Sequence, residues 1–430
     1  MHHHRYATPF AVIVVSCAAA STAAQPPDTP PPPPGHALEI GDLLVKRNLA
    51  DAVADLQRRL EQAPDDDTAR FGLGMAQFLS SGENLFRSLY RHGHDPDMTY
   101  LAWVLGIMQW PVPVNPNPLE ITYEDMRGII ERWREDLLAA DRTLAAIDDD
   151  QVKLRLRLGI VMMDFDDDGA AEPDEALFGV FNRAQRRFTA TREIAEIWHI
   201  AFDRGDVDWL RGYIHICTAL AELALACDWR DIFERTAHLN FQKPVTPYPY
   251  LVHRDSRQWG DNWKTVDFIA VVHGLRCEVV EPMRCRAALD HLLAAIELSH
   301  GMWNHYNAET DDDYEWIPNP GQQAVIPRGA VTKEQQETWR LFLDEAAALL
   351  RGERLLRFWR TADGENRAEG LGVNVHRLFT EPRTFDLVYW VQGTAALPYL
   401  EEGMLTEPQI WARLEEAFNR HTFRHMWWFN

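Results

Sequence analysis

The sequence has little positive charge, few cysteines and no long apolar segment beyond its N-terminus. Lys and Arg number 43 against 65 Asp and Glu, so the 430-residue chain has a formal net charge of −22 at pH 7. Nucleic-acid binding relies on clustered Lys and Arg, and this balance argues against a nucleic-acid partner. The same charge repels anionic lipid headgroups and raises the local concentration of cations. No later segment approaches the ~20 consecutive apolar residues that a membrane-spanning helix needs.

The cysteines and the known catalytic motifs add few constraints. The chain contains no CxxC or zinc-site spacing, and no GxSxG, P-loop or GxGxxG in a strand–helix context. Cys217 and Cys227 lie on one expected helix, about 15 Å apart along its axis, which is too far for a disulfide. Cys277 and Cys285 flank a short loop with Pro282 and could pair locally. Disulfides and free buried thiols both remain open.

The N-terminus has the pattern of an export signal. Residues 1–24 combine a polar start, a short apolar run and a small-residue stretch that ends at Ala24. Val14 to Cys17 resembles a bacterial lipobox, which would instead make 1–16 a lipoprotein signal and Cys17 a lipid anchor. Residues 25–36 are a proline-rich linker with extended polyproline character. We therefore expect an exported protein, either periplasmic or anchored at the cell envelope, with Cys17 as its only membrane attachment.

Residues 37–430 are expected to form a helical domain. Hydrophobic residues make up 46% of the chain, enough for a sizeable core. Helical spacing recurs and persistent strand patterns are few, which predicts an all-α fold. A loop-like stretch near 240–262 could divide the domain into two packed subdomains. The expected helices lie at about 51–63, 69–79, 122–148, 193–202, 206–227, 262–275, 285–299, 333–359 and 408–418.

The first two of these helices form a recognisable pair. A helix from Asp51 stops before Pro64, and a second amphipathic helix begins at Ala69. Gly72 and Gly74 on the second helix would allow another helix to approach closely. The succession resembles a tetratricopeptide repeat over residues 38–90 and implies a multi-helix array that begins with TPR-like helical hairpins. No 34-residue recurrence follows, so a complete solenoid is not expected.

The sharpest chemical signal is the twelve-residue stretch Asp164–Glu175. Acids stand at its positions 1, 3, 5, 9 and 12, and glycine stands at position 6. This arrangement resembles the calcium loop of an EF-hand, which binds a hard cation through oxygen atoms. The resemblance implies Ca²⁺ as the ligand and one EF-hand-like helix–loop–helix. The implied ligands are Asp164, Asp166, Asp168, the carbonyl of Ala170, Glu172 and a bidentate Glu175.

The flanks of this loop are less regular than its centre. Apolar and basic residues alternate at the start of 154–163, which permits a short strand. The same stretch leads directly into the loop, which favours an entering helix, and the exiting helix is expected to begin at Ala176. Ala171 occupies position 8, where a larger apolar residue normally contacts a partner loop, and the sequence has no second loop of this pattern. We therefore expect weak affinity, roughly 10⁻⁴–10⁻³ M, and a structural calcium ion.

A histidine-based transition-metal site is one alternative interpretation. Several histidines lie on neighbouring expected helices, with acids close by in sequence. None has the HExxH spacing, and isolated histidines on helix faces are more often packing residues. The residues concerned are His199, His215, His291, His300, His305, Glu222, Asp290 and Glu297.

A glycan-active periplasmic enzyme with an aromatic cleft near 300–360 is the other alternative. Glu315 or Asp313 would then act as acid or base. A buried aromatic core explains the same residues and is favoured, because large aromatics are mostly buried. The aromatic residues are Trp303, Tyr306, Tyr314, Trp316, Trp339, Phe358 and Trp359.

The preferred expectation is therefore an exported, calcium-stabilised helical protein without catalytic activity. The TPR-like beginning suggests that it acts as an interaction or assembly factor with a protein partner. The sequence identifies neither that partner nor a substrate.

Overall fold

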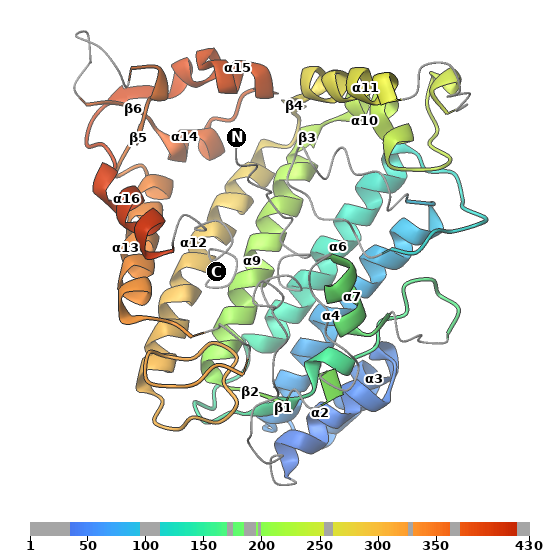
Figure 1. Cartoon of the computed structure of the whole chain (residues 1–430), viewed down its shortest axis with the longest axis vertical. Helices are drawn as coiled ribbons and strands as arrows, with labels where there is room; N and C mark the ends of the chain where they lie inside the picture. The colour runs from blue at the N-terminus through green and yellow to red at the C-terminus, as the bar shows by residue number, and fades with distance from the viewer. Residues whose placement is uncertain are drawn as a thin grey trace.

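The computed structural model describes residues 35–94, 112–169, 175–184, 195–196, 199–252, 261–325, 330–361 and 370–418. Over these residues the chain is mostly helical (Figure 1). None of the helices described there has the length and apolar character needed to cross a bilayer. The expected signal and Cys17, the linker up to residue 34, and the C-terminal residues 419–430 lie outside the described residues.

Long helices lie side by side and form the body of the protein (Figure 1). In chain order, α4 packs on α6, α6 on α9, α9 on α12 and α12 on α13, while α2 and α3 cover α4. The first helices are α2 (His36–Lys46), α3 (Leu49–Gln62), α4 (Asp67–Arg91), α6 (Tyr123–Leu144), η1 (Leu158–Ile160) and α7 (Leu177–Ala184). The middle ones are α9 (Arg204–Ala226), α10 (Arg230–Thr236), η3 (Ala237–Leu239), η4 (Pro249–Leu251), α11 (Asp261–Gly274) and α12 (Pro282–Ala308). The last are α13 (Lys333–Arg351), η5 (Trp359–Thr361), α14 (Val375–Thr380), α15 (Leu387–Gln392), η6 (Thr394–Tyr399) and α16 (Pro408–Ala417).

In the described part of the chain, three small antiparallel sheets accompany the helices, so the fold is mostly α and not entirely so. The sheets have the strand orders β1-β2, β3-β4-β7 and β5-β6-β8, and each joins segments far apart in the chain. The register of the first pairs Leu154 with Phe202, and that of the second pairs Cys227 with Val279. The strands are β1 (Leu154–Leu156), β2 (Ile200–Phe202), β3 (Cys227–Asp228), β4 (Arg276–Val279), β5 (Leu356–Arg357), β6 (Leu371–Val373), β7 (Phe385–Asp386) and β8 (Leu400–Glu402).

Three expected helical segments differ from the structure. The preferred helix over 154–163 is wrong, because strand β1 and the short η1 occupy most of that stretch. Residues 200–202 form strand β2 and not the end of a helix. Helix α13 ends at Arg351 because Gly352 adopts a left-handed conformation, with φ of +77°.

Side-chain caps fix where several long helices begin, among them α4, α6, α9 and α13. Thr122 and Asp125 form the capping box of α6, which confirms the predicted start of that helix. Helix α9, expected from about residue 206, begins slightly earlier, at Arg204. Asp203 is the N-cap, and Asp206 returns a hydrogen bond to its backbone.

Glycines on α4 confirm the predicted close approach of helices. A Cβ atom on Gly72 would lie 2.4 Å from the Ile40 side chain of α2. A Cβ atom on Gly74 would lie 2.4 Å from Leu144, the last residue of α6. Glycine therefore sets the distance of α4 from α2 and from α6.

Most of the aromatic residues near 300–360 belong to the core. Trp303, Tyr306, Trp316 and Trp339 are all at most 2% exposed. Trp316 packs edge-on against Trp209 of α9, with ring centroids 5.3 Å apart. These side chains therefore stabilise the contacts among α9, α12 and α13 and do not line a surface cleft.

Candidate metal centre

The loop that begins at Asp164 reverses the chain through its own first side chain. Oδ1 of Asp164 accepts a hydrogen bond from the backbone nitrogen of Asp167 at 2.7 Å, and Oδ2 accepts one from Gly169 at 3.2 Å. Asp167 and Gly169 have φ angles of +62° and +77°. Aspartate tolerates that region moderately and glycine freely, so the sequence supplies suitable residues at both reversals.

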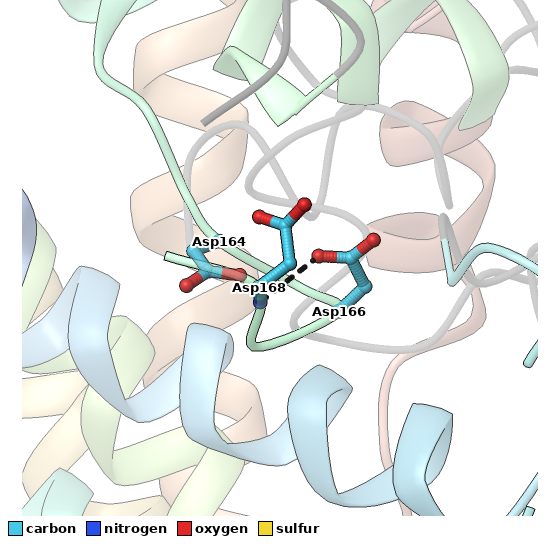
Figure 2. A group of neighbouring side chains, drawn as sticks. All are labelled: Asp164, Asp166 and Asp168. Atoms are coloured by element: carbon cyan, nitrogen blue, oxygen red, sulfur yellow. Dashed lines mark hydrogen bonds between the residues drawn. The ribbon is translucent and has the colours of Figure 1, made fainter. Parts of the chain in front are cut away.

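Three carboxylates of the loop come together as the sequence predicts. Oxygen atoms of Asp164, Asp166 and Asp168 all lie within 4.8 Å of one another. Ligands at opposite sides of a calcium ion are separated by about 4.6–5.2 Å, so this spacing suits one ion. Figure 2 shows the three side chains gathered on the turn, with the hydrogen bond from the Asp168 nitrogen to Asp166 dashed.

The pKa of Asp166 is raised by partial burial, with further contributions from the charges of Asp168 and Asp164. The nearby Tyr90 on α4 also has a raised pKa, through burial and then the charges of Asp166 and Asp168. Negative charge is therefore concentrated at this turn. A bound cation would relieve that repulsion.

The last predicted ligand takes a different position. Glu175 is buried, and its Oε1 accepts a hydrogen bond from the backbone nitrogen of Phe165 at 2.8 Å. It is not part of the three-carboxylate group. Bidentate binding would require this side chain to turn. Ala170 and Glu172, the other two predicted ligands, lie outside the described residues.

A short backbone stem closes the loop where an EF-hand would have an entering helix. The nitrogen of Met163 donates to the carbonyl of Glu175 at 3.1 Å, and that of Leu177 donates to Val161 at 3.0 Å. Between them, Met162 and Ala176 form an antiparallel bridge. The two flanks of the loop thus hold each other, and α7 leaves from the second flank.

Two arginines of α4 pair with Asp167, which is not part of the three-carboxylate group, and Arg87 also pairs with Asp164 at 3.5 Å. Asp167 forms ion pairs with Arg91 at 2.6 Å and Arg87 at 3.3 Å. Arg87 also donates to the backbone carbonyl of Asp164 at 3.1 Å and pairs with Glu83 at 2.7 Å. Burial raises the pKa of Glu83 to about 7, against the opposing effect of Arg87. These contacts attach the loop to α4.

The structure also brings together Asp203, Glu309 and Glu315, a group that the sequence analysis missed. Their carboxylate oxygens lie within 4.8 Å of one another at the N-terminus of α9. Burial, the charge of Asp203 and a hydrogen bond to Asp203 raise the pKa of Glu309 to about 9. Burial raises the pKa of Glu315 to about 7.

The raised pKa of Glu309 favours its protonated form, which can donate a hydrogen bond to Asp203. Oδ1 of Asp203 accepts from the backbone nitrogen of Gly205 at 2.8 Å, as the N-cap of α9. The capping pattern at Asp203 and Asp206 was the available signal, but sequence spacing alone could not bring Glu309 and Glu315 to it.

The histidines named above are distributed over separate contacts. His215 and His291 are hydrogen-bonded through their Nδ1 atoms at 2.8 Å, with Asp141 at 3.6 Å from His215. His300 faces Asp344, and His305 faces Asp208. Glu222 is held by Arg134 and Arg284. Within the described residues, the two groups able to hold a metal with three ligands contain no histidine.

The chain matches no protein-family model, and neither the curated proteins nor the solved structures give a significant match.

Proposed function

We propose that this is an exported helical protein stabilised by one calcium ion bound at Asp164–Glu175. The observation that carries the proposal is the group of Asp164, Asp166 and Asp168, whose oxygens lie within 4.8 Å of one another on a single turn. Ala170, Glu172 and Glu175 are the further ligands that an EF-hand-like loop would supply. The signal-like residues 1–24, or 1–16 with a lipid anchor at Cys17, would place the protein where calcium is plentiful.

The donor set favours calcium over other metals. The three grouped side chains offer only carboxylate oxygens, which suit hard cations and are poor ligands for soft transition metals. Calcium accepts six to eight oxygens in irregular arrangements, whereas Mg²⁺ demands a near-ideal octahedron. A loop whose acids are partly exposed and partly hydrogen-bonded to its own backbone fits the more tolerant ion.

A structural role for the ion agrees with the surroundings of the loop. Phe165, between two of the carboxylates, is buried and packs edge-on against Phe86 of α4 at a centroid distance of 5.3 Å. The stem then leads into α7. Neutralising the carboxylates would therefore strengthen the connection between α4 and α7. The TPR-like hairpins expected at 38–90 favour a protein partner, and we include such a partner in the proposal.

Calorimetric titration of the purified mature protein tests the metal. We expect one site for Ca²⁺ with Kd of roughly 10⁻⁴–10⁻³ M and weaker binding of Mg²⁺. At tenfold Kd the ion should add about 1.4 kcal/mol to the free energy of unfolding, visible as a higher melting temperature. Glu175→Gln should weaken binding. Absence of both heat and stabilisation at millimolar calcium would exclude the proposal, and unchanged binding in Glu175→Gln would place the ion elsewhere.

A further inference from the structure

Three cysteines from different elements meet at one end of the α9–α12 pair. Cys227 belongs to β3, Cys277 to β4, and Cys285 to the first turn of α12. The thiols of all of them are free in the structure. Figure 1 shows β3 and β4 at the upper end of α9, beside α10 and α11. This end of the protein is distant in sequence from the calcium loop and is not used by the proposed function.

The sheet register places Cys227 and Cys277 on the same face. Cys227 lies opposite Val279, and Cys277 precedes Val279 by two residues. Side chains two apart on a strand point to the same face, so the two cysteines are diagonal neighbours. Their thiols lie close enough for each to shift the pKa of the other. Both side chains are partly buried, which leaves them accessible to a small oxidant.

The other cysteines are less suitable partners. Cys285 is 4% exposed, and burial raises the pKa of its thiol to about 11. Cys217 is fully buried, and burial alone raises the pKa of its thiol. The expected local pairing of Cys277 with Cys285 therefore competes with a thiol contact that already exists across the sheet.

The surroundings of Cys227 favour its thiolate. The Cys277 thiol stabilises the Cys227 thiolate, and the Arg127 guanidinium adds positive charge, so the pKa of Cys227 is lowered. Arg127 is held in place by donating to the backbone carbonyls of Cys227 at 3.0 Å and Leu225 at 2.9 Å. The pKa of Cys277 is raised by its hydrogen bond to Cys227 and by burial. Cys227 is thus the better nucleophile for the first attack on a disulfide, and Cys277 is suited to react second.

We propose that Cys227 and Cys277 form a disulfide by exchange with a small-molecule or protein disulfide. Cys227, after losing its proton to water, attacks the reagent disulfide and releases one thiolate. Cys277 gives its proton to that thiolate and attacks the Cys227 sulfur. The second thiolate leaves and takes up the first proton. The two cysteines lose two electrons, and the reagent gains them as two thiols.

The bond would close a loop of about 50 residues that contains α10 and α11. It would also fix β4 between its neighbours, since Cys277 lies opposite Phe385 of β7. The disulfide therefore joins the end of α9 to the segment that leads into α12. Its formation requires an oxidant but not calcium.

Oxidation of the purified mature protein with oxidised glutathione tests the pairing. Remaining thiols are alkylated, and the protein is digested and mapped by mass spectrometry without reduction. We expect one crosslinked peptide pair, containing Cys227 and Cys277, with Cys217 and Cys285 alkylated. Oxidation should raise the melting temperature by about 5 °C. A crosslink from Cys277 to Cys285, or alkylation of both Cys227 and Cys277, overturns the proposal.

Two variants test the order of reaction. In the Cys277→Ser variant, Cys227 should remain joined to glutathione, because no second thiol is present to displace the glutathione. Cys227→Ser should leave Cys277 unmodified under the same conditions. Cys285→Ser serves as the matched control, and its crosslink and melting-temperature shift should equal those of the original protein. Modification of Cys277 but not Cys227 in these single variants would contradict the assignment.

Discussion

Four aspartates within five residues of the loop have different surroundings. Asp164, Asp166 and Asp168 share one small volume, whereas Asp167 turns to Arg87 and Arg91 on α4. Substitutions of single aspartates can therefore distinguish the proposed metal ligands from the residue that attaches the loop to α4. The proposed ion would contact the first three, and the fourth would attach the loop to the helix.

Asp166→Asn should weaken calcium binding at least about tenfold, because it removes a charged ligand from the group. Asp167→Asn is the matched control and should change Kd by less than about threefold, since its ion pairs are partly exposed and contribute under about 1 kcal/mol. Calcium titration of both variants provides the measurement. Equal losses in the two variants would mean that only the total charge of the loop matters.

Glu309 gives a second prediction at the level of one side chain. Its pKa is raised to about 9 by burial and by Asp203, well above the ~4.3 of an unfolded glutamate. The contribution of protonated Glu309 to the free energy of unfolding is therefore complete below the pKa of the unfolded glutamate. It is lost progressively as pH rises from there toward 9.

Glu309→Gln imitates the protonated acid and should remove this loss. At pH 8 we expect the variant to exceed the original protein by about 1 kcal/mol in free energy of unfolding, because solvent screens a partly buried group. At pH 5 the two should agree. Urea unfolding at both pH values measures the effect. Glu297→Gln, on an exposed part of α12, should show no such dependence on pH.

Among the elements, helix α4 packs so closely against the end of α6 that no side chain fits at Gly74. Gly74→Ala would bring a Cβ atom within 2.4 Å of Leu144, which is buried. Overpacking of this kind costs about 1–3 kcal/mol, and the better helix propensity of alanine returns up to about 1. We expect a net loss of about 1–2 kcal/mol in chemical denaturation.

Gly128→Ala on α6 is the control for helix propensity. The nearest atom to its added Cβ is the Arg132 side chain at 3.5 Å, an ordinary contact. This variant should gain up to about 1 kcal/mol. A loss at Gly128 as large as that at Gly74 would show that backbone effects, and not the contact with Leu144, decide the result.

The long helices could be predicted because their signals are local. Thr122 and Asp125 are three residues apart, and their reciprocal hydrogen bonds begin α6 as expected. Strands of two to four residues have no such signal. Leu154 is extended because it pairs with Phe202, and no short window of sequence contains both residues. The alternation at 154–158 permits a strand, and this tertiary pairing decides for it against the helix expected from the lead into the loop.

The same distinction applies to the candidate metal centre. Asp164, Asp166, Asp168 and Gly169 could be identified because the ligand order of a calcium loop is a local pattern. The contacts of Arg87 and Arg91 could not, since these residues precede the loop by a long stretch of chain. The group formed by Asp203, Glu309 and Glu315 was beyond prediction for the same reason.

For the molecule as a whole, the contact between α9 and α12 makes stability depend on pH. His215 and His291 meet there, and burial lowers the pKa of both, that of His215 to about 4. Asp141 partly opposes the effect on His215, while His291 and Arg211 add to it. An unfolded histidine has a pKa of ~6.5, so the stabilisation is complete above that pH and is lost as pH falls toward 4.

His215→Gln should make the protein less sensitive to acid. Between pH 7 and pH 5 the original protein should lose about 1–2 kcal/mol more than this variant in urea unfolding. His273→Gln on α11, an exposed position, should behave as the original protein does. An identical decline in all three proteins would assign the acid sensitivity to carboxylates elsewhere.

The proposed calcium site lies in a loop closed by the stem of Val161–Met163 and Glu175–Leu177, and this arrangement predicts the shape of its binding curve. The hydrogen bonds of the stem join the loop to itself, so occupancy of the loop has no second loop of the same pattern to influence. Binding should follow a simple hyperbola with a Hill coefficient near one. Moving from one-tenth to nine-tenths saturation then takes on the order of an eighty-fold change in free calcium. Such a gradual curve suits an environment whose calcium concentration is steady and high.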